Sequence, residues 1–159
     1  MLRKKNWVIL FLILGITNVV SNLSFVQSAE ARTSEKIDQK VFVQLGKGTE
    51  DLHAAIMALK LSHDLQAKGA KVTLFLNLEA VRIADKRQNI DLQWGPAGGS
   101  TLRSLYDGFV TKGGTVLICR MCANAAGLED ANLRNGSKIQ KADDEVAMSI
   151  LNSDKTLSY

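Results

Sequence analysis

Short runs of apolar residues alternate with longer amphipathic stretches along most of the chain. The runs are rich in β-branched and aromatic residues and end at glycine or polar residues, which is the pattern of buried strands. Strands are therefore expected at 41–45, 71–76, 115–118 and 137–140, with a terminal strand at 155–159.

The stretches between these runs carry apolar residues at the 3-to-4 spacing that is typical of a helix packed on one face. The first helix is expected at about 50–68, after Thr49 as its capping residue, and it is expected to end at Gly69. A second helix is expected after Ser100, and a third opens with the acidic residues 143–145.

Strands that alternate with helices favour right-handed β-α-β crossovers and parallel pairing. The sequence therefore predicts an α/β three-layer sandwich, in which a mostly parallel sheet of about five strands lies between helices. No low-complexity tract or linker divides it. Residues 41–159 are expected to form a single domain, preceded by a flexible polar lead-in at 32–40.

The first 31 residues have the order of features of a secretory signal peptide. Basic residues lie at 3–5, an apolar run follows at 7–20, and Ala29 and Ala31 supply the small residues that a signal peptidase requires. Cleavage after Ala31 is the prediction, and an uncleaved N-terminal anchor is the alternative. The mature protein is then expected to be periplasmic or secreted, without a stable membrane span.

Charge gives no reason to propose a nucleic-acid partner. The formal charge is +4, but residues 1–31 hold three basic residues and one acid, so their removal lowers it to +2. A protein that binds the phosphate backbone concentrates basic residues on one face. The hydrophobic content of 46% excludes a disordered chain.

Cys119 and Cys122 form one C-x-x-C directly after the expected third strand. Two cysteines are too few for a disulfide-rich scaffold, and parallel sheets gather their sites beyond the carboxyl ends of the strands. A thiol at a helix start beside Arg120 is expected to have a lowered pKa and to react as the thiolate. His53, in the first turn of the first long helix, is expected near the same edge as a proton donor or acceptor.

Other interpretations of the cysteines stay open. The pair is also consistent with inert buried thiols, with a local disulfide in an oxidising compartment, or with half of a zinc site. His53 and His63 lie ten residues apart on one helix and do not share a face, so no metal or cofactor is predicted. A thioredoxin-like site is excluded, because the motif comes late and the only proline, Pro96, lies in a glycine-rich loop.

The loop Gly46-Lys47-Gly48-Thr49 follows the first strand at the same expected edge. It lacks the glycine spacing of a dinucleotide-binding turn and the G-K-[ST] ending of a P-loop. A tight strand-to-helix turn is one interpretation, and a backbone nest for a small ligand or anion is the other.

The chain resembles the DsrE/DsrF-like family of small sulfur-relay proteins over nearly all of residues 40–159. The matching segments are VFVQLGKGTEDLHAAIMALKLSHDLQAKGAKVTLFLNLEAV, GGTVLICRMCANAAGL and ADDEVAMSILNSDKTLSY. The resemblance implies a flavodoxin-like fold and assembly into homo-oligomers such as trimers or hexamers. It also implies that a cysteine after the third strand carries sulfane sulfur as a persulfide. Cys119 matches that cysteine by its place at the strand end and its spacing to Gly127, and Cys122 is the second candidate.

Two features depart from the family pattern. The motif has two thiols where a relay site commonly has one, and this chain is predicted to be exported. The prediction is an exported sulfurtransferase-like carrier that uses Cys119-x-x-Cys122 with a sulfur donor or acceptor protein. His53 and Arg120 are expected to support the thiols electrostatically. The alternative is a non-catalytic oligomeric module that binds a small ligand or a protein, with its cysteines in a structural or redox disulfide.

Overall fold

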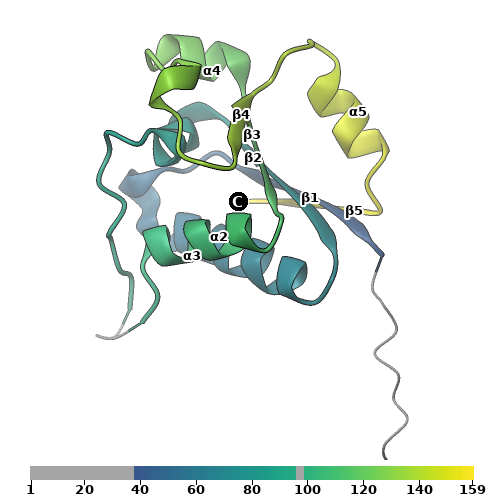
Figure 1. The fold of residues 1–159 in the computed structure, drawn as a ribbon, viewed down its shortest axis with the longest axis horizontal. Helices are drawn as coiled ribbons and strands as arrows, with labels where there is room; N and C mark the ends of the chain where they lie inside the picture. Colours follow the sequence, from purple (N-terminus) through teal and green to yellow (C-terminus); the bar gives the residue numbers. More distant parts are fainter. Residues whose placement is uncertain (1–37, 96–98) are drawn as a thin grey trace, which may run out of the picture. The chain divides into compact units, whose positions relative to one another are not determined.

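The computed structural model of the protein describes residues 38–95 and 99–159 (Figure 1). The predicted signal peptide, most of the predicted lead-in and the Pro96 segment lie outside the described residues. Among the described residues, no helix has both the length and the apolar character needed to cross a membrane.

One sheet of five strands runs in the order β4-β3-β2-β1-β5, and every neighbouring pair is parallel. The strands are β1 (Lys40–Leu45), β2 (Lys71–Leu76), β3 (Thr115–Ile118), β4 (Ser137–Ile139) and β5 (Lys155–Ser158). The predicted α/β class is confirmed. The ends of β1, β4 and β5 differ from the expected ones by one residue each.

Both α-helices and short 3₁₀ helices connect the strands. The α-helices are α2 (Leu52–Ala67), α3 (Leu102–Thr111), α4 (Arg120–Ala125) and α5 (Glu145–Leu151). The 3₁₀ helices are η1 (Thr49–Asp51), η2 (Leu78–Ala84) and η3 (Asp130–Asn132).

The predicted capping residues of the two longest helices are wrong. Asp51, not Thr49, caps α2, because its carboxylate accepts the Ala54 N–H at 3.1 Å. The chain first makes the 3₁₀ turn η1, which moves the start of α2 along the sequence. Thr101, not Ser100, caps α3, and its hydroxyl accepts a backbone N–H three residues later.

The direction of the chain across the sheet decides which face each helix covers. Strands β1 to β4 follow one another in one direction, so right-handed crossovers place α2 and α3 on the same face, where they pack against each other. The chain then returns past β1 to β5, and the same handedness places α5 on the other face. Figure 1 shows α5, in yellow, apart from α2 and α3. The predicted three-layer arrangement is confirmed.

The two faces of the sheet are covered to different degrees. The face under α2 and α3 carries the main core, whose largest members include Leu45, Leu59, Leu74, Tyr106 and Phe109. The other face carries a small cluster of Phe42, Phe75 and Leu117, against which Val146 of α5 packs. Helix α5 covers this face only in part, because Lys40 and Lys71, on the same face of β1 and β2, stay exposed.

The carboxyl ends of the three central strands are level with one another. Leu45 at the end of β1 pairs with Leu76 at the end of β2, and Leu76 pairs with Ile118 at the end of β3. The next residue of each strand, Gly46, Asn77 and Cys119, therefore lies on the same edge of the sheet. This edge holds the cysteine motif.

Candidate functional site

Cys119 leaves β3 while still bonded to its neighbouring strand. Its backbone N–H donates to the Leu76 carbonyl at 2.9 Å, so the sheet pairing continues up to this residue. Its Sγ accepts the backbone N–H of Cys122 at 3.3 Å and thereby caps the short helix α4. Both thiols are free and half-buried.

Cys122 is held by a segment that is distant in the sequence. Its Sγ accepts the backbone N–H of Leu78, in the loop after β2, at 3.3 Å. Cys122 packs against the main core, whereas Cys119 packs against the small cluster on the α5 side. The two sulfurs therefore stand at the end of the sheet, one toward each of its faces.

The segment that contacts Cys122 has two unusual features. Leu78 has a left-handed backbone with φ of 47°, which strains a residue with a large side chain, and its side chain is 65% exposed. The side-chain oxygen Oδ1 of Asn77 is buried and, among the described residues, has no hydrogen-bond partner. Strained backbone and unpartnered buried polar atoms tend to gather at functional sites. Sequence reasoning missed both features, because neither residue carries a local signal for them.

Burial raises the pKa of the Cys119 thiol above its ordinary value, and a hydrogen bond with the Cys122 side chain raises it further. The backbone N–H of Cys122 opposes this shift only in part. The predicted lowering of the pKa is therefore wrong for Cys119. Desolvation disfavours the charged thiolate, and the backbone N–H groups of Cys122 and Met121 do not compensate for it.

The two residues expected to support the thiols contact other groups. The Arg120 guanidinium donates to the Lys141 carbonyl at 2.8 Å and pairs with Asp143, both in the segment between β4 and α5. The His53 ring stacks on Trp94, with the ring centroids 3.7 Å apart and the planes 5° from parallel. Neither of these contacts includes a thiol, and the supporting roles of Arg120 and His53 stay predictions.

The two glycine amides of the loop after β1 donate to partners within the chain. The Gly46 N–H donates to the carbonyl of the C-terminal residue at 3.1 Å, and the Gly48 N–H donates to the Glu50 carboxylate at 2.9 Å. The Glu50 carboxylate thus occupies the place where an anion would meet the Gly48 amide. Lys47 and Thr49 are exposed. These contacts favour the tight-turn interpretation, and a ligand or anion in this loop stays a prediction.

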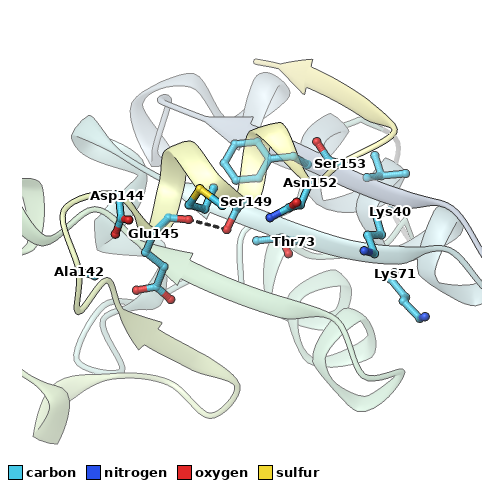
Figure 2. A pocket seen from close by; sticks show the side chains of 12 residues that line it. Lys40, Lys71, Thr73, Ala142, Asp144, Glu145, Ser149, Asn152 and Ser153 are labelled. Atoms are coloured by element: carbon cyan, nitrogen blue, oxygen red, sulfur yellow. Dashed lines mark hydrogen bonds between the residues drawn. The ribbon is translucent and has the colours of Figure 1, made fainter.

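A cavity of about 540 Å³ lies between α5 and strands β1 and β2 (Figure 2). Its wall includes Lys40, Lys71 and Thr73 from the strands and Glu145 and Ser149 from α5. Neither cysteine lines it. The cavity follows from the partial cover that α5 gives to this face and is separate from the thiol site.

Within residues 38–95 and 99–159, no group of three His, Cys, Asp or Glu side chains is arranged to hold a metal ion. The chemistry that this edge offers is therefore argued from its two sulfurs and the amides around them.

A model of the DsrE/DsrF-like family matches residues 39–159. The chain belongs to this family. The match confirms the resemblance that the sequence carries, and it includes both cysteines and the glycine loop. No curated protein sequence matches the chain.

Several solved structures share the fold of this DsrE/DsrF-like protein. The ychN protein from E. coli has a TM-score of 0.60 and 21% identity, over 77% of this chain and 100% of its own. MTH1491 from Methanobacterium thermoautotrophicum, a protein of unknown function, has a TM-score of 0.58 and 10% identity, and the match covers 77% of this chain and 100% of MTH1491. BT1422 from Bacteroides thetaiotaomicron, a conserved protein of unknown function, has a TM-score of 0.56 and 15% identity, and the match covers 79% of this chain and 98% of BT1422. These likenesses establish the flavodoxin-type fold.

Proposed function

We propose that this DsrE/DsrF-like protein is an exported carrier of sulfane sulfur that uses Cys119 and Cys122. The observation that carries the proposal is the pair of free, half-buried thiols at the carboxyl edge of the sheet. A persulfide forms when a thiolate attacks a sulfane donor, so the sulfur must be reachable and must be near groups that accommodate charge. Each of the two sulfurs accepts one backbone N–H.

The proposal includes partners and a location. A sulfur donor or acceptor protein exchanges sulfur with the thiols in the periplasm or outside the cell, and the protein is a homo-oligomer such as a trimer or hexamer. Apolar side chains left exposed on two helices support an oligomer. They are Met57 on α2 and Met148, Ile150 and Leu151 on α5, exposed by 42%, 48%, 37% and 77%.

Sulfur loading tests the proposal directly. The protein is purified from cells that express the full chain, incubated with inorganic polysulfide, and measured by intact mass. We expect an adduct of about 32 Da, one sulfur, in the wild type immediately after loading or in at least one of the variants Cys119→Ser and Cys122→Ser. Wild-type protein alkylated with iodoacetamide before loading is the control. Absence of the adduct from all three proteins, without any thiol oxidation, would contradict the carrier function.

The raised pKa of Cys119 provides a second test. Because its pKa lies above that of a free thiol, about 8.5, native Cys119 stays protonated as the pH rises through that value. Site-resolved iodoacetamide labelling is therefore expected to reach its half-maximal rate at a higher pH than in the denatured chain. The variant Cys122→Ala removes the neighbouring thiol and should move the profile back toward lower pH. Identical profiles in native and denatured protein would contradict the burial argument.

A non-catalytic oligomeric binding module is the second candidate. The cavity of about 540 Å³ under α5 and the exposed apolar side chains of that helix favour it. In this case the protein acquires no sulfur adduct. An oxidised pair without sulfur transfer indicates a structural or redox disulfide, and unreactive free thiols indicate a module that binds a ligand or protein.

A further inference from the structure

The two sulfurs of the motif have different surroundings. Cys119 Sγ is the capping acceptor of its own helix and lies against the apolar cluster of Phe42, Phe75 and Leu117. Cys122 Sγ accepts an N–H from Leu78, which comes from another segment, 44 residues away. The Cys122 sulfur thus has a donor that is independent of the motif and of α4.

The Leu78 amide is held on Cys122 by its surroundings. Leu78 keeps a left-handed backbone although its exposed side chain gains little from burial there, and the neighbouring Asn77 backbone N–H is bonded to the Leu45 carbonyl at 3.1 Å. An amide N–H that points at a sulfur stabilises negative charge on that sulfur. Cys119 Sγ also accepts a backbone N–H, but burial raises the pKa of Cys119 and favours its protonated form.

We propose that Cys122 takes up the sulfane sulfur and that Cys119 then releases it as hydrogen sulfide, so that the motif reduces the sulfur that it binds. This inference rests on the proposed function and adds the order of the two thiols and the product. In the first step the Cys122 thiolate attacks a polysulfide chain of n sulfurs. One S–S bond of the chain breaks, a Cys122–S–S⁻ persulfide forms, and a polysulfide dianion of n − 1 sulfurs leaves.

In the second step Cys119 gives its proton to the charged outer sulfur of the Cys122 persulfide, and the resulting Cys119 thiolate attacks the inner sulfur. A Cys119–Cys122 disulfide bond forms, the bond to the outer sulfur breaks, and that sulfur leaves as HS⁻ with the proton that Cys119 held. Two cysteine sulfurs are oxidised and the sulfane sulfur is reduced by two electrons, so atoms, charge and electrons balance. A dithiol reductant then restores both thiols and is itself oxidised to a disulfide.

The spacing of the motif suits the second step. Residues three apart at the start of a helix have Cβ atoms about 5–6 Å apart on one face. Disulfides join residues with Cβ atoms about 3.5–4.5 Å apart, so the bridge requires a small approach of the two side chains at the start of α4. The hydrogen bond from the Cys122 N–H to Cys119 Sγ, at 3.3 Å, already brings the Cys119 sulfur over the first turn of α4.

The experiment follows the fate of one bound sulfur. Protein expressed as the full chain and fully reduced is loaded briefly with inorganic polysulfide, and the donor is removed by gel filtration. Intact mass and released sulfide are then measured over time for the wild type, Cys119→Ser and Cys122→Ser. Circular dichroism of each variant shows whether it keeps the fold, and the wild-type result decides the product even if one variant does not fold.

We expect the wild type to lose about 2 Da relative to the reduced chain and to release about one sulfide per chain, as the internal disulfide forms. Cys119→Ser should keep the adduct of about 32 Da and release no sulfide, whereas Cys122→Ser should lose at least about tenfold in adduct. Adding a dithiol should return the wild type to its reduced mass.

Three outcomes overturn the inference, and they are distinct from failure of the carrier function. A wild type that keeps its adduct without releasing sulfide is a carrier but does not reduce sulfur. An adduct that persists in Cys122→Ser and is absent from Cys119→Ser reverses the order of the thiols. Release of sulfide without an internal disulfide excludes the second step. If no protein acquires sulfur or becomes oxidised, the proposed carrier function itself fails.

Discussion

The loop after β1 and the loops after β2 and β3 lie on the same edge of the sheet, yet they differ in how far their polar groups are hydrogen-bonded within the chain. In the first loop, the amides of Gly46 and Gly48 donate to partners within the chain. In the other two, Asn77 Oδ1 is buried without a described partner, Leu78 has a left-handed backbone, and two thiols are free.

This difference indicates where the chemistry of the edge resides. A loop whose glycine amides are already bonded within the chain connects a strand to a helix and leaves those amides unavailable to an anion. A segment that keeps a strained residue and an unpartnered polar atom gives up stability, and folds retain such features mainly where function requires them. The comparison predicts that substitutions in the first loop lower stability by disturbing a close-packed turn, whereas substitutions at Asn77 and Leu78 change it through the unpartnered oxygen and the strained backbone.

The largest expected change in stability comes from Gly48→Ala. The added Cβ would lie 2.8 Å from the backbone oxygen of Glu79, and backbone cannot rotate away as a side chain can. We expect the free energy of unfolding to fall by about 3 kcal/mol in urea denaturation. The matched control is Gly46→Ala, whose Cβ would have its nearest neighbours at 3.4 Å, and it should cost less than about 1 kcal/mol. Equal losses in both variants would contradict the close approach at Gly48.

The next largest change is expected from Asn77→Asp, which places a carboxylate at the buried, unpartnered oxygen. We expect a loss of about 2 kcal/mol at neutral pH, because the charge is desolvated without compensation. Burial should raise the pKa of this new carboxyl above its unfolded value of about 3.9.

The pH dependence of Asn77→Asp then has a definite sign. Since the folded pKa of the new carboxyl is the higher one, the stability of the variant relative to the wild type is greatest below about pH 4 and is lost as the pH rises through the folded pKa. Urea denaturation at several pH values measures this, with Asn89→Asp as the exposed control. The Asn89 side chain accepts the Asp91 N–H at 2.9 Å, a role that a carboxylate retains. A loss that does not depend on pH would argue against a buried charge.

A smaller change tests which residue caps α2. Asp51→Ala removes the carboxylate that accepts the Ala54 N–H, and it should lower the free energy of unfolding by about 1 kcal/mol. Thr49→Ala, in the same turn, should change it by less than about 0.5 kcal/mol. Thermal unfolding of the two variants side by side measures the difference, and a larger loss for Thr49→Ala would restore the capping role that the sequence suggests.

The smallest change is expected from Leu78→Asn, and it is a gain. Asparagine tolerates a left-handed backbone better than leucine does, and the exposed Leu78 side chain loses little burial. We expect an increase of about 0.5–1 kcal/mol with sulfur loading retained, because the backbone N–H toward Cys122 stays in place. Leu78→Val should instead be destabilising, since a β-branched side chain is more strained at this φ. A clear loss of stability in Leu78→Asn would show that the leucine side chain has a partner.

Much of the fold was predictable because its signals are local. Short runs bounded by glycine or polar residues located all five strands to within one residue, and Gly69, with φ of 96°, ends α2 as predicted. The capping residues were not predictable, since Thr49 and Asp51 are both good capping residues. The choice between them depends on a 3₁₀ turn that the sequence does not mark.

The sequence by itself determined that two thiols follow a buried strand of a parallel α/β sheet, because strand periodicity and motif spacing are properties of neighbouring residues. Only the tertiary structure decided the environment of those thiols. The pKa of Cys119 rises through burial, Arg120 pairs with the segment before α5, and the amide over Cys122 belongs to Leu78, 44 residues away. These properties depend on which surfaces come into contact when the helices pack on the sheet. Local sequence patterns do not determine those contacts.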